Sequence, residues 1–156
     1  LNLLDLGFSD VPCVALADDN FLWLYDQAKD KVLKMDRRDK RIRLESLAIS
    51  QILNKENKVI GLYSSINGFL LTTDIGLLSF DIMGNFIQFE PMNGIDKAEW
   101  TGSSWLILNP EGWWILKENF RLYKVKEALE CKDWTYSNGK IFLWNGKSIE
   151  SLQISL

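Results

Sequence analysis

The sequence predicts an all-β protein of the β-propeller type, with about four blades of four antiparallel strands each. Short apolar runs closed by turn residues recur from about Val14, Val59, Ala98 and Trp134, at spacings of 45, 39 and 36 residues. Four strands in about 40 residues is the period of a propeller blade. The runs FLWLY, GFLL, WLIL, WWIL and IFLW do not alternate with polar residues, which indicates strands covered on both faces. Sheets stacked around a propeller axis have both faces covered, whereas a two-sheet sandwich leaves one face of each sheet in water.

The individual strands are predicted from their length, their aromatic content and the turn residues that flank them. The linkers at 66–68, 83–85, 109–112 and 145–146 are rich in Gly and Asn, which is typical of hairpin turns. We therefore expect a chain of antiparallel hairpins. Its strands are predicted at 21–26, 31–36, 58–63, 68–73, 76–81, 84–89, 103–108, 112–117, 120–125, 133–137, 140–145 and 147–154.

Two segments have apolar residues at helical spacing. Residues 44–53 place Leu44, Leu47, Ala48 and Ile52 on one side, and residues 124–131 have a weaker pattern of the same kind. Both are short, so we expect them to be helical connections between repeats.

No Pro/Gly/Ser-rich linker divides the chain, so we expect a single structural unit over residues 1–156. Its predicted blades cover approximately residues 14–58, 59–97, 98–133 and 134–156.

Composition excludes several classes of function. The 156 residues are 47% hydrophobic, enough for the core of one domain. Lys and Arg number 18 and Asp and Glu 21, and the net charge of −3 argues against nucleic-acid binding. No apolar run is long enough to span a membrane. His is absent, which removes His-based acid–base chemistry and most zinc and iron sites.

Cys13 and Cys131 belong to different predicted repeats. A disulfide requires Cα atoms within about 7 Å, so we expect both thiols to stay reduced, with one long-range disulfide as the alternative. The chain has no CxxC motif that would indicate a redox or metal-binding role.

Two stretches resemble known propeller repeats. GFLLTTDIGLLSFDIMGNFI (68–87) resembles the repeat of bacterial sensor-type propellers, and FLWLYDQAKDKVLKMDRRDKRI (21–42) resembles NHL-like and lactonase-like propellers. As a whole the chain is similar to uncharacterised bacterial propeller proteins of the cell envelope. The resemblance implies a propeller fold and an envelope or periplasmic location. Lactonase-like propellers hold a central metal with Glu, Asn and Asp residues, and no residues here match those ligands.

Aromatic residues are the first candidates for a binding site. Trp100, Trp105, Trp113 and Trp114 lie in one predicted blade, where they could form a platform for sugar rings or a peptide groove. The alternative is packing between blades, since the adjacent Trp113 and Trp114 point to opposite faces of a strand and both faces of a blade are buried. We expect packing.

Residues 29–43 (KDKVLKMDRRDKRIR) are a second candidate. They contain eight basic and three acidic side chains, a local charge of +5 that leaves −8 on the rest of the chain. One interpretation is a docking patch for an acidic partner, a phosphate or an anionic surface. The other is a solvated hairpin whose cations discourage unwanted strand pairing.

Acidic residues at turns are the third candidate. Asp18, Asp19 and Asn20 lack the alternating spacing and the distal Glu of a calcium loop, so they predict a polar turn. A second set recurs at strand ends, where Asp accepts backbone N–H bonds, and this predicts a structural role. It consists of Asp26, Asp36, Asp74 and Asp81.

The sequence contains no nucleophile elbow, phosphate-binding Gly loop or isolated carboxylate pair. We therefore predict no catalytic residues, no metal and no cofactor. The resulting hypothesis is a non-catalytic scaffold for protein–protein interaction that binds no nucleic acid and does not span a membrane. The alternative is a carbohydrate-active or lactonase-like propeller with a metal in its central channel, favoured by fold analogy and Trp content.

Four blades would leave open edges and apolar outer faces at residues 22–24 of the first blade and 141–143 of the last. Such faces associate unless they are covered. The chain also begins within an apolar run, LNLLDLGF, with no starting Met. We expect the ends to be covered by the remaining blades of a larger ring, or by a second copy in a homodimer.

Overall fold

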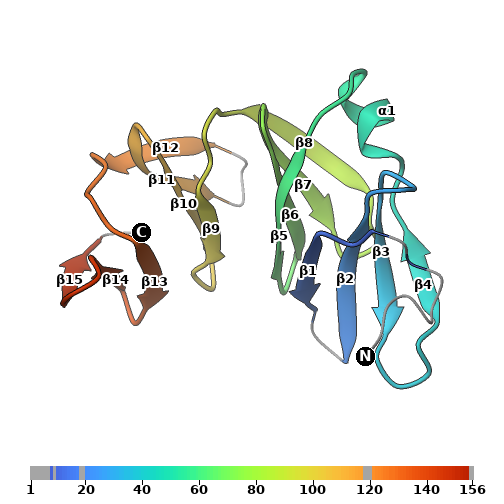
Figure 1. Ribbon diagram of the computed structural model, residues 1–156, viewed down its shortest axis with the longest axis horizontal. Coiled ribbons are helices and arrows are strands. Elements are labelled where there is room, and N and C mark those ends of the chain that lie inside the picture. Colours follow the sequence, from blue (N-terminus) through green and yellow to red (C-terminus); the bar gives the residue numbers. More distant parts are fainter. Residues whose placement is uncertain (1–7, 9, 18–19, 118–120, 155–156) are drawn as a thin grey trace. The chain divides into compact units, whose positions relative to one another are not determined.

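The computed structural model describes residues 8, 10–17, 20–117 and 121–154. Within these ranges the chain forms fifteen β-strands and one short helix, α1 (Ile49–Leu53). The strands make four antiparallel sheets, each built from strands that are consecutive in the chain. The chain divides into two compact units, Leu1–Asn93 (unit 1) and Gly94–Leu156 (unit 2), whose strands are labelled in Figure 1.

Unit 1 contains two four-stranded sheets joined through α1. Sheet A consists of β1 (Cys13–Leu16), β2 (Phe21–Asp26), β3 (Lys31–Asp36) and β4 (Ile42–Glu45). Sheet B consists of β5 (Val59–Ser65), β6 (Gly68–Thr73), β7 (Gly76–Asp81) and β8 (Phe86–Pro91).

The two sheets of unit 1 pack through aromatic and aliphatic side chains. The ring centroids of Trp23 in sheet A and Phe69 in sheet B are 4.5 Å apart. Phe69 in turn stacks on Phe80, with the same distance between ring centroids. Because side chains alternate along a strand, Trp23 and Tyr25 face sheet B, and the neighbouring Leu24 faces away.

The outer face of sheet A, the one turned away from sheet B, is also buried. Leu24, Leu33 and Met35 on this face are 0% exposed. Phe8 belongs to the same apolar cluster and is 5% exposed, and Val11 packs against the cluster. Phe8 and Val11 therefore pack on this outer face, so the apolar face expected at residues 22–24 is not open.

Unit 2 contains one four-stranded and one three-stranded sheet. Sheet C consists of β9 (Lys97–Trp100), β10 (Ser104–Asn109), β11 (Gly112–Lys117) and β12 (Leu122–Lys126). Sheet D consists of β13 (Asp133–Ser137), β14 (Lys140–Trp144) and β15 (Ile149–Gln153).

Sheets C and D pack around a pair of indoles. Trp113 of β11 and Trp134 of β13 meet edge to face at a centroid distance of 4.7 Å, and they are 0% and 3% exposed. Ile141 and Leu143 of β14 belong to the same cluster. The face of sheet D that carries Trp134, Ile141 and Leu143, its inner face, thus packs against sheet C.

Glycines begin several hairpin strands because a neighbouring backbone lies too close for a side chain. A Cβ on Gly68 would lie 2.0 Å from the carbonyl oxygen of Phe80, and one on Gly112 would lie 2.2 Å from that of Lys126. Both residues have positive φ, of 146° and 142°, which also favours glycine. A side chain at either position would therefore clash with the backbone of the neighbouring strand.

Both helical predictions need correction. Only Ile49–Leu53 of the segment 44–53 is helical, because Leu44 lies in β4, opposite Lys34 of β3. The segment 124–131 contains no helix, since Leu122–Lys126 pairs with β11 as strand β12. An isolated helix of this length is marginal in water, and the free edge of a sheet provides a better partner for its backbone.

The predicted all-β fold with four antiparallel sheets is confirmed. Several of the non-alternating strands are buried on both faces, as in β6 and β10, where all six residues are buried. Strand β14 is an exception, because Ile141 and Leu143 are buried and Trp144 is exposed. Among the described residues no helix is long and apolar enough to cross a membrane.

Candidate functional site

The outer face of sheet D carries exposed apolar side chains. Along β14 the inward residues Ile141 and Leu143 are 0% and 6% exposed, whereas the alternate residues Phe142 and Trp144 point to the other face. Ile149 of β15 lies opposite Trp144 in the register. Trp144 is 46% exposed and Ile149 70%.

These side chains line a shallow groove of about 290 Å³. We call it the D-face groove, and it is bounded by Lys97, Asp133, Trp134, Thr135, Phe142, Trp144 and Ile149. Strands β13 to β15 supply most of the lining, and Lys97 comes from β9 of sheet C. The groove therefore has an apolar floor on one sheet and a charged rim shared with the next.

Polar contacts hold the rim of the D-face groove in place. Lys97 Nζ lies 3.1 Å from Asp133 Oδ1 and donates to the carbonyl oxygen of Trp134. Glu99 accepts from the Thr135 hydroxyl at 2.7 Å and from the Tyr136 N–H at 3.1 Å. The hydrogen bond from Lys97, helped by the Trp134 N–H, lowers the pKa of the Asp133 carboxyl. The charged groups of the rim, Lys97, Asp133 and Glu99, are therefore engaged in hydrogen bonds and ion pairs with their neighbours.

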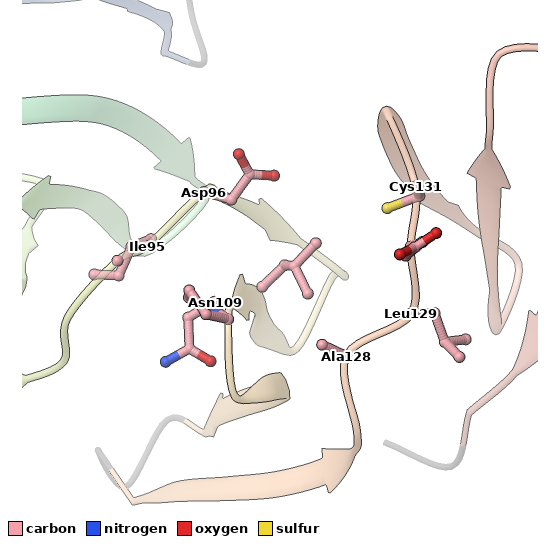
Figure 2. A pocket seen from close by; sticks show the side chains of 10 residues that line it. Ile95, Asp96, Asn109, Ala128, Leu129 and Cys131 are labelled. Carbon is pink, nitrogen blue, oxygen red and sulfur yellow. The ribbon is translucent and has the colours of Figure 1, made fainter.

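A second cavity, of about 440 Å³, lies at another part of unit 2. Ile95, Asp96 and Asn109 line it from the ends of β9 and β10, and residues 128–131 line it from the segment between β12 and β13 (Figure 2). Asn109 Oδ1 accepts from the N–H groups of residues 111 and 112 and from the Trp114 indole N–H at 2.9 Å. Asn109 therefore builds the β10–β11 turn.

The thiol in this cavity is not activated. Burial raises the pKa of Cys131, and the nearby carboxylates of Asp96 and Asp133 raise it further against an opposing effect of Lys97. A protonated thiol is a poor nucleophile. Cys13 in unit 1 is buried, and its burial also raises its pKa. Both cysteines are free thiols.

Unit 1 carries a third candidate surface, the turn between β3 and β4. We call residues 37–43 the cationic turn, since five of the seven are Arg or Lys. Its backbone is tied down at several points: the Asp36 N–H donates to the Arg41 carbonyl at 2.9 Å, and the Lys40 N–H donates to the Asp36 carbonyl at 2.8 Å. The Arg37 N–H donates to the carbonyl of Asn20 at 2.9 Å.

Asp36 organises the cationic turn. Its carboxylate accepts from the Arg38 N–H at 2.9 Å and from Arg43 Nη2 at 3.1 Å, and the residue is 3% exposed. The Arg38 N–H, followed by the Arg43 and Arg38 side chains, lowers the pKa of Asp36 to about 2, although burial opposes this. Asp36 is therefore fully charged at neutral pH.

The Trp residues singled out in the sequence are mostly structural. Trp105 and Trp113 are 8% and 0% exposed, and Trp100 packs edge to face on Trp105 at 5.2 Å. Trp114 is half-buried, and its indole N–H donates a hydrogen bond to Asn109 Oδ1. The four side chains form no open platform.

The recurring Asp residues accept backbone N–H bonds as predicted. Asp26 accepts from residue 29, Asp74 from residue 58, and Asp81 from residues 83 and 85. Asp18 and Asp19 lie outside the described residues. Asn20, beside them, is an exposed turn residue with φ 70°. No group of three or more His, Cys, Asp and Glu residues among those described could hold a metal ion.

The D-face groove is the feature that sequence reasoning located only in part. An apolar outer face was expected at residues 141–143, but Ile141 and Leu143 point inward and Phe142 alone points out. Trp144 and Ile149 were not singled out. The alternation of β14 contains the signal, because Phe142 and Trp144 share one face of the strand.

No known protein family pattern matches the sequence, and no curated protein is similar to it. Solved structures do match. BamB from Moraxella catarrhalis has a TM-score of 0.64 at 14% identity, over 87% of this chain and 40% of that one. The N-terminal domain of Nup159 gives 0.59 at 11% identity, over 95% and 45%. Streptogramin B lyase gives 0.59 at 15% identity, over 93% and 55%.

These similar structures are β-propellers. At such low identity the likeness establishes the fold alone, so the sheets of this chain are of the β-propeller type. The chain spans about half the length of the structures it matches.

Proposed function

We propose that this protein is a non-catalytic interaction module that docks a partner protein at the D-face groove. The observation that carries the proposal is the open apolar surface of Phe142, Trp144 and Ile149 on the outer face of sheet D. Exposed apolar patches with a polar rim are typical of protein interaction sites.

The groove is suited to an apolar anchor from a partner. Its floor is rigid because the inner face of sheet D packs on sheet C, and its rim is held by the Lys97–Asp133 ion pair. A preformed site loses little conformational entropy on binding. Trp is among the residues that contribute most to interface energies, so Trp144 is the expected centre of the contact.

The chemistry of the other candidates supports a non-catalytic role. The Cys131 thiol has a raised pKa, and the amide oxygen of Asn109 is occupied by the turn that it builds. The fold itself does not choose between roles, since one similar structure is a lyase. Another is part of a structure in which Dbp5 is bound to Nup159, so the same fold also serves protein binding.

The proposal is tested by selecting peptides from a displayed random library against the full chain. We expect the selected peptides to carry an aromatic or aliphatic anchor. Trp144→Ala should weaken their binding by about tenfold or more, as expected for a central interface residue. Tyr123→Ala is the matched control, because Tyr123 is an aromatic side chain of the same unit with a similar exposed fraction of 42%.

Two results would contradict the proposal. One is a set of peptides that bind Trp144→Ala and the unchanged chain equally well. The other is stoichiometric Ca²⁺ or Zn²⁺ in the purified protein, which would favour the metal-dependent propeller considered from the sequence.

A further inference from the structure

The cationic turn presents exposed positive charge on unit 1. Its five basic residues are all exposed. Arg38 and Arg41 are 74% and 77% exposed, and their ion-pair contacts are long, at 3.5 and 4.0 Å. Arg37 and Lys40 take part in none of the ion pairs found among the described residues.

The acidic residues of the turn are already engaged. Arg43 Nη2 lies 3.1 Å from Asp36 Oδ2 and also contacts Asp39. Asp39 Oδ1 additionally accepts from the Arg41 N–H at 3.1 Å. Arg43 and the turn backbone make the short contacts to both carboxylates, and Arg38 and Arg41 add only the long ones. The side chains of Arg37, Arg38, Lys40 and Arg41 remain exposed.

This arrangement differs from a flexible basic hairpin. Asp36 is buried and binds the turn from inside, and Lys40 has a left-handed φ of 61° that is held by its N–H bond to the Asp36 carbonyl. The cations therefore emerge from a backbone whose shape is already set. A guanidinium is well suited to carboxylate, because its planar fork donates to two oxygens at once.

Charge elsewhere on the chain restricts what binds there. Residues 29–43 carry +5 and the rest of the chain −8. A long polyanion or an extended anionic surface would meet this opposing charge, whereas a short acidic segment needs only the turn. Screening limits the reach of exposed charges to about 8 Å at physiological salt, so the local charge decides the contact of a short ligand.

We propose that the cationic turn docks a short acidic segment of a partner protein, with Arg37, Arg38, Lys40 and Arg41 facing its carboxylates. This inference rests on the proposed function in that the partner is a protein. It concerns a different surface, however, and it assigns the chemistry of the ligand there.

The test uses the full chain and a fluorescent peptide of mixed Asp and Glu residues at low salt. We expect Arg37→Glu/Lys40→Glu to weaken binding by about tenfold or more, since complementary charge governs such contacts. Lys55→Glu/Lys58→Glu is the matched control, because it makes the same change of charge at exposed residues of the same unit. The control should change the affinity by about twofold or less, an effect of long-range charge alone. Far-UV circular dichroism checks that both variants fold.

Several outcomes would overturn the inference. They are no binding of the peptide to the unchanged chain, equal weakening by the two double variants, and equally tight binding of an oligonucleotide or a phosphatidylserine vesicle at the same residues. Trp144→Ala separates this inference from the proposed function, because it should leave the acidic peptide bound. A loss of library peptides without a loss of the acidic peptide, or the reverse, shows which surface is active.

Discussion

The outer faces of sheets A and D have similar apolar content and opposite exposure. In sheet A, Leu24, Leu33 and Met35 are 0% exposed beneath Phe8. In sheet D, Trp144 is 46% exposed and Ile149 70%. The difference arises from the side chains that reach each face. Phe8 and Val11, which precede β1, pack on the outer face of sheet A. Lys97 and Lys132 reach the outer face of sheet D but leave Trp144 and Ile149 exposed. The sequence of an apolar strand thus indicates an apolar face, but it does not show whether other residues of the same unit bury that face.

The first test removes the cover from sheet A. Phe8→Ala should lower the free energy of unfolding by about 3 kcal/mol or more, the usual cost of deleting a buried Phe side chain. Urea denaturation followed by circular dichroism measures the loss. Ile149→Ala provides the comparison on the open face, where a change within about 0.5 kcal/mol is expected for a surface residue. Equal effects of the two substitutions would remove the distinction between the faces.

The second test concerns the acid response of the two units. Asp36 is buried and its pKa is about 2, below the ordinary 3.8, so its contribution to stability is present above about pH 4 and is lost as the pH falls toward 2. Asp36→Asn should therefore lower the thermal midpoint at neutral pH and flatten the decline between pH 4 and pH 2, measured by thermal melts across this range.

Asp133 in unit 2 provides the contrast for the acid response. Its pKa is also lowered, through Lys97, but its side chain is 66% exposed, so solvent screens the ion pair. Asp133→Asn should change the same melts less than Asp36→Asn does. A larger effect at Asp133 would contradict the view that the cationic turn is the more tightly organised of the two sites.

A smaller effect on stability than that of Phe8→Ala is expected at the centre of the D-face groove. Trp144→Ala should change the free energy of unfolding by about 1 kcal/mol or less, because nearly half of the residue is exposed to water. Binding of a dye specific for exposed apolar surface should fall at the same time. A loss of stability comparable with that of Phe8→Ala would mean that Trp144 is covered within the folded protein.

Local chemistry explains why much of the fold was predictable. Hairpins such as β6–β7 follow from residues that act on their own neighbours: Thr73 Oγ1 accepts from the Ile75 and Gly76 N–H groups at 3.3 and 3.1 Å. At the next turn, the Asp81 carboxylate accepts from the N–H groups of residues 83 and 85. Because these hydrogen bonds join residues only a few positions apart, they can be predicted from the local sequence pattern.

The helical predictions failed where distant strands compete with local propensity. Leu44 pairs with Lys34, and the segment from Leu122 pairs with β11. Spacing within these segments contains no information about a partner strand elsewhere. The same limit applied to β14, where the pattern indicated an apolar strand but not which of its residues faced sheet C.

The sequence by itself determined an all-β chain of repeated hairpins, the turn role of its Asp residues and the surplus of positive charge in residues 29–43. Only the tertiary structure decided that Phe8 covers sheet A, that Arg43 engages both Asp36 and Asp39, and that Phe142, Trp144 and Ile149 form one open groove. The physical reason is the distance along the chain between the residues that interact. Turns and strand propensity depend on adjacent residues, whereas burial and charge pairing depend on which faces meet after the strands have paired.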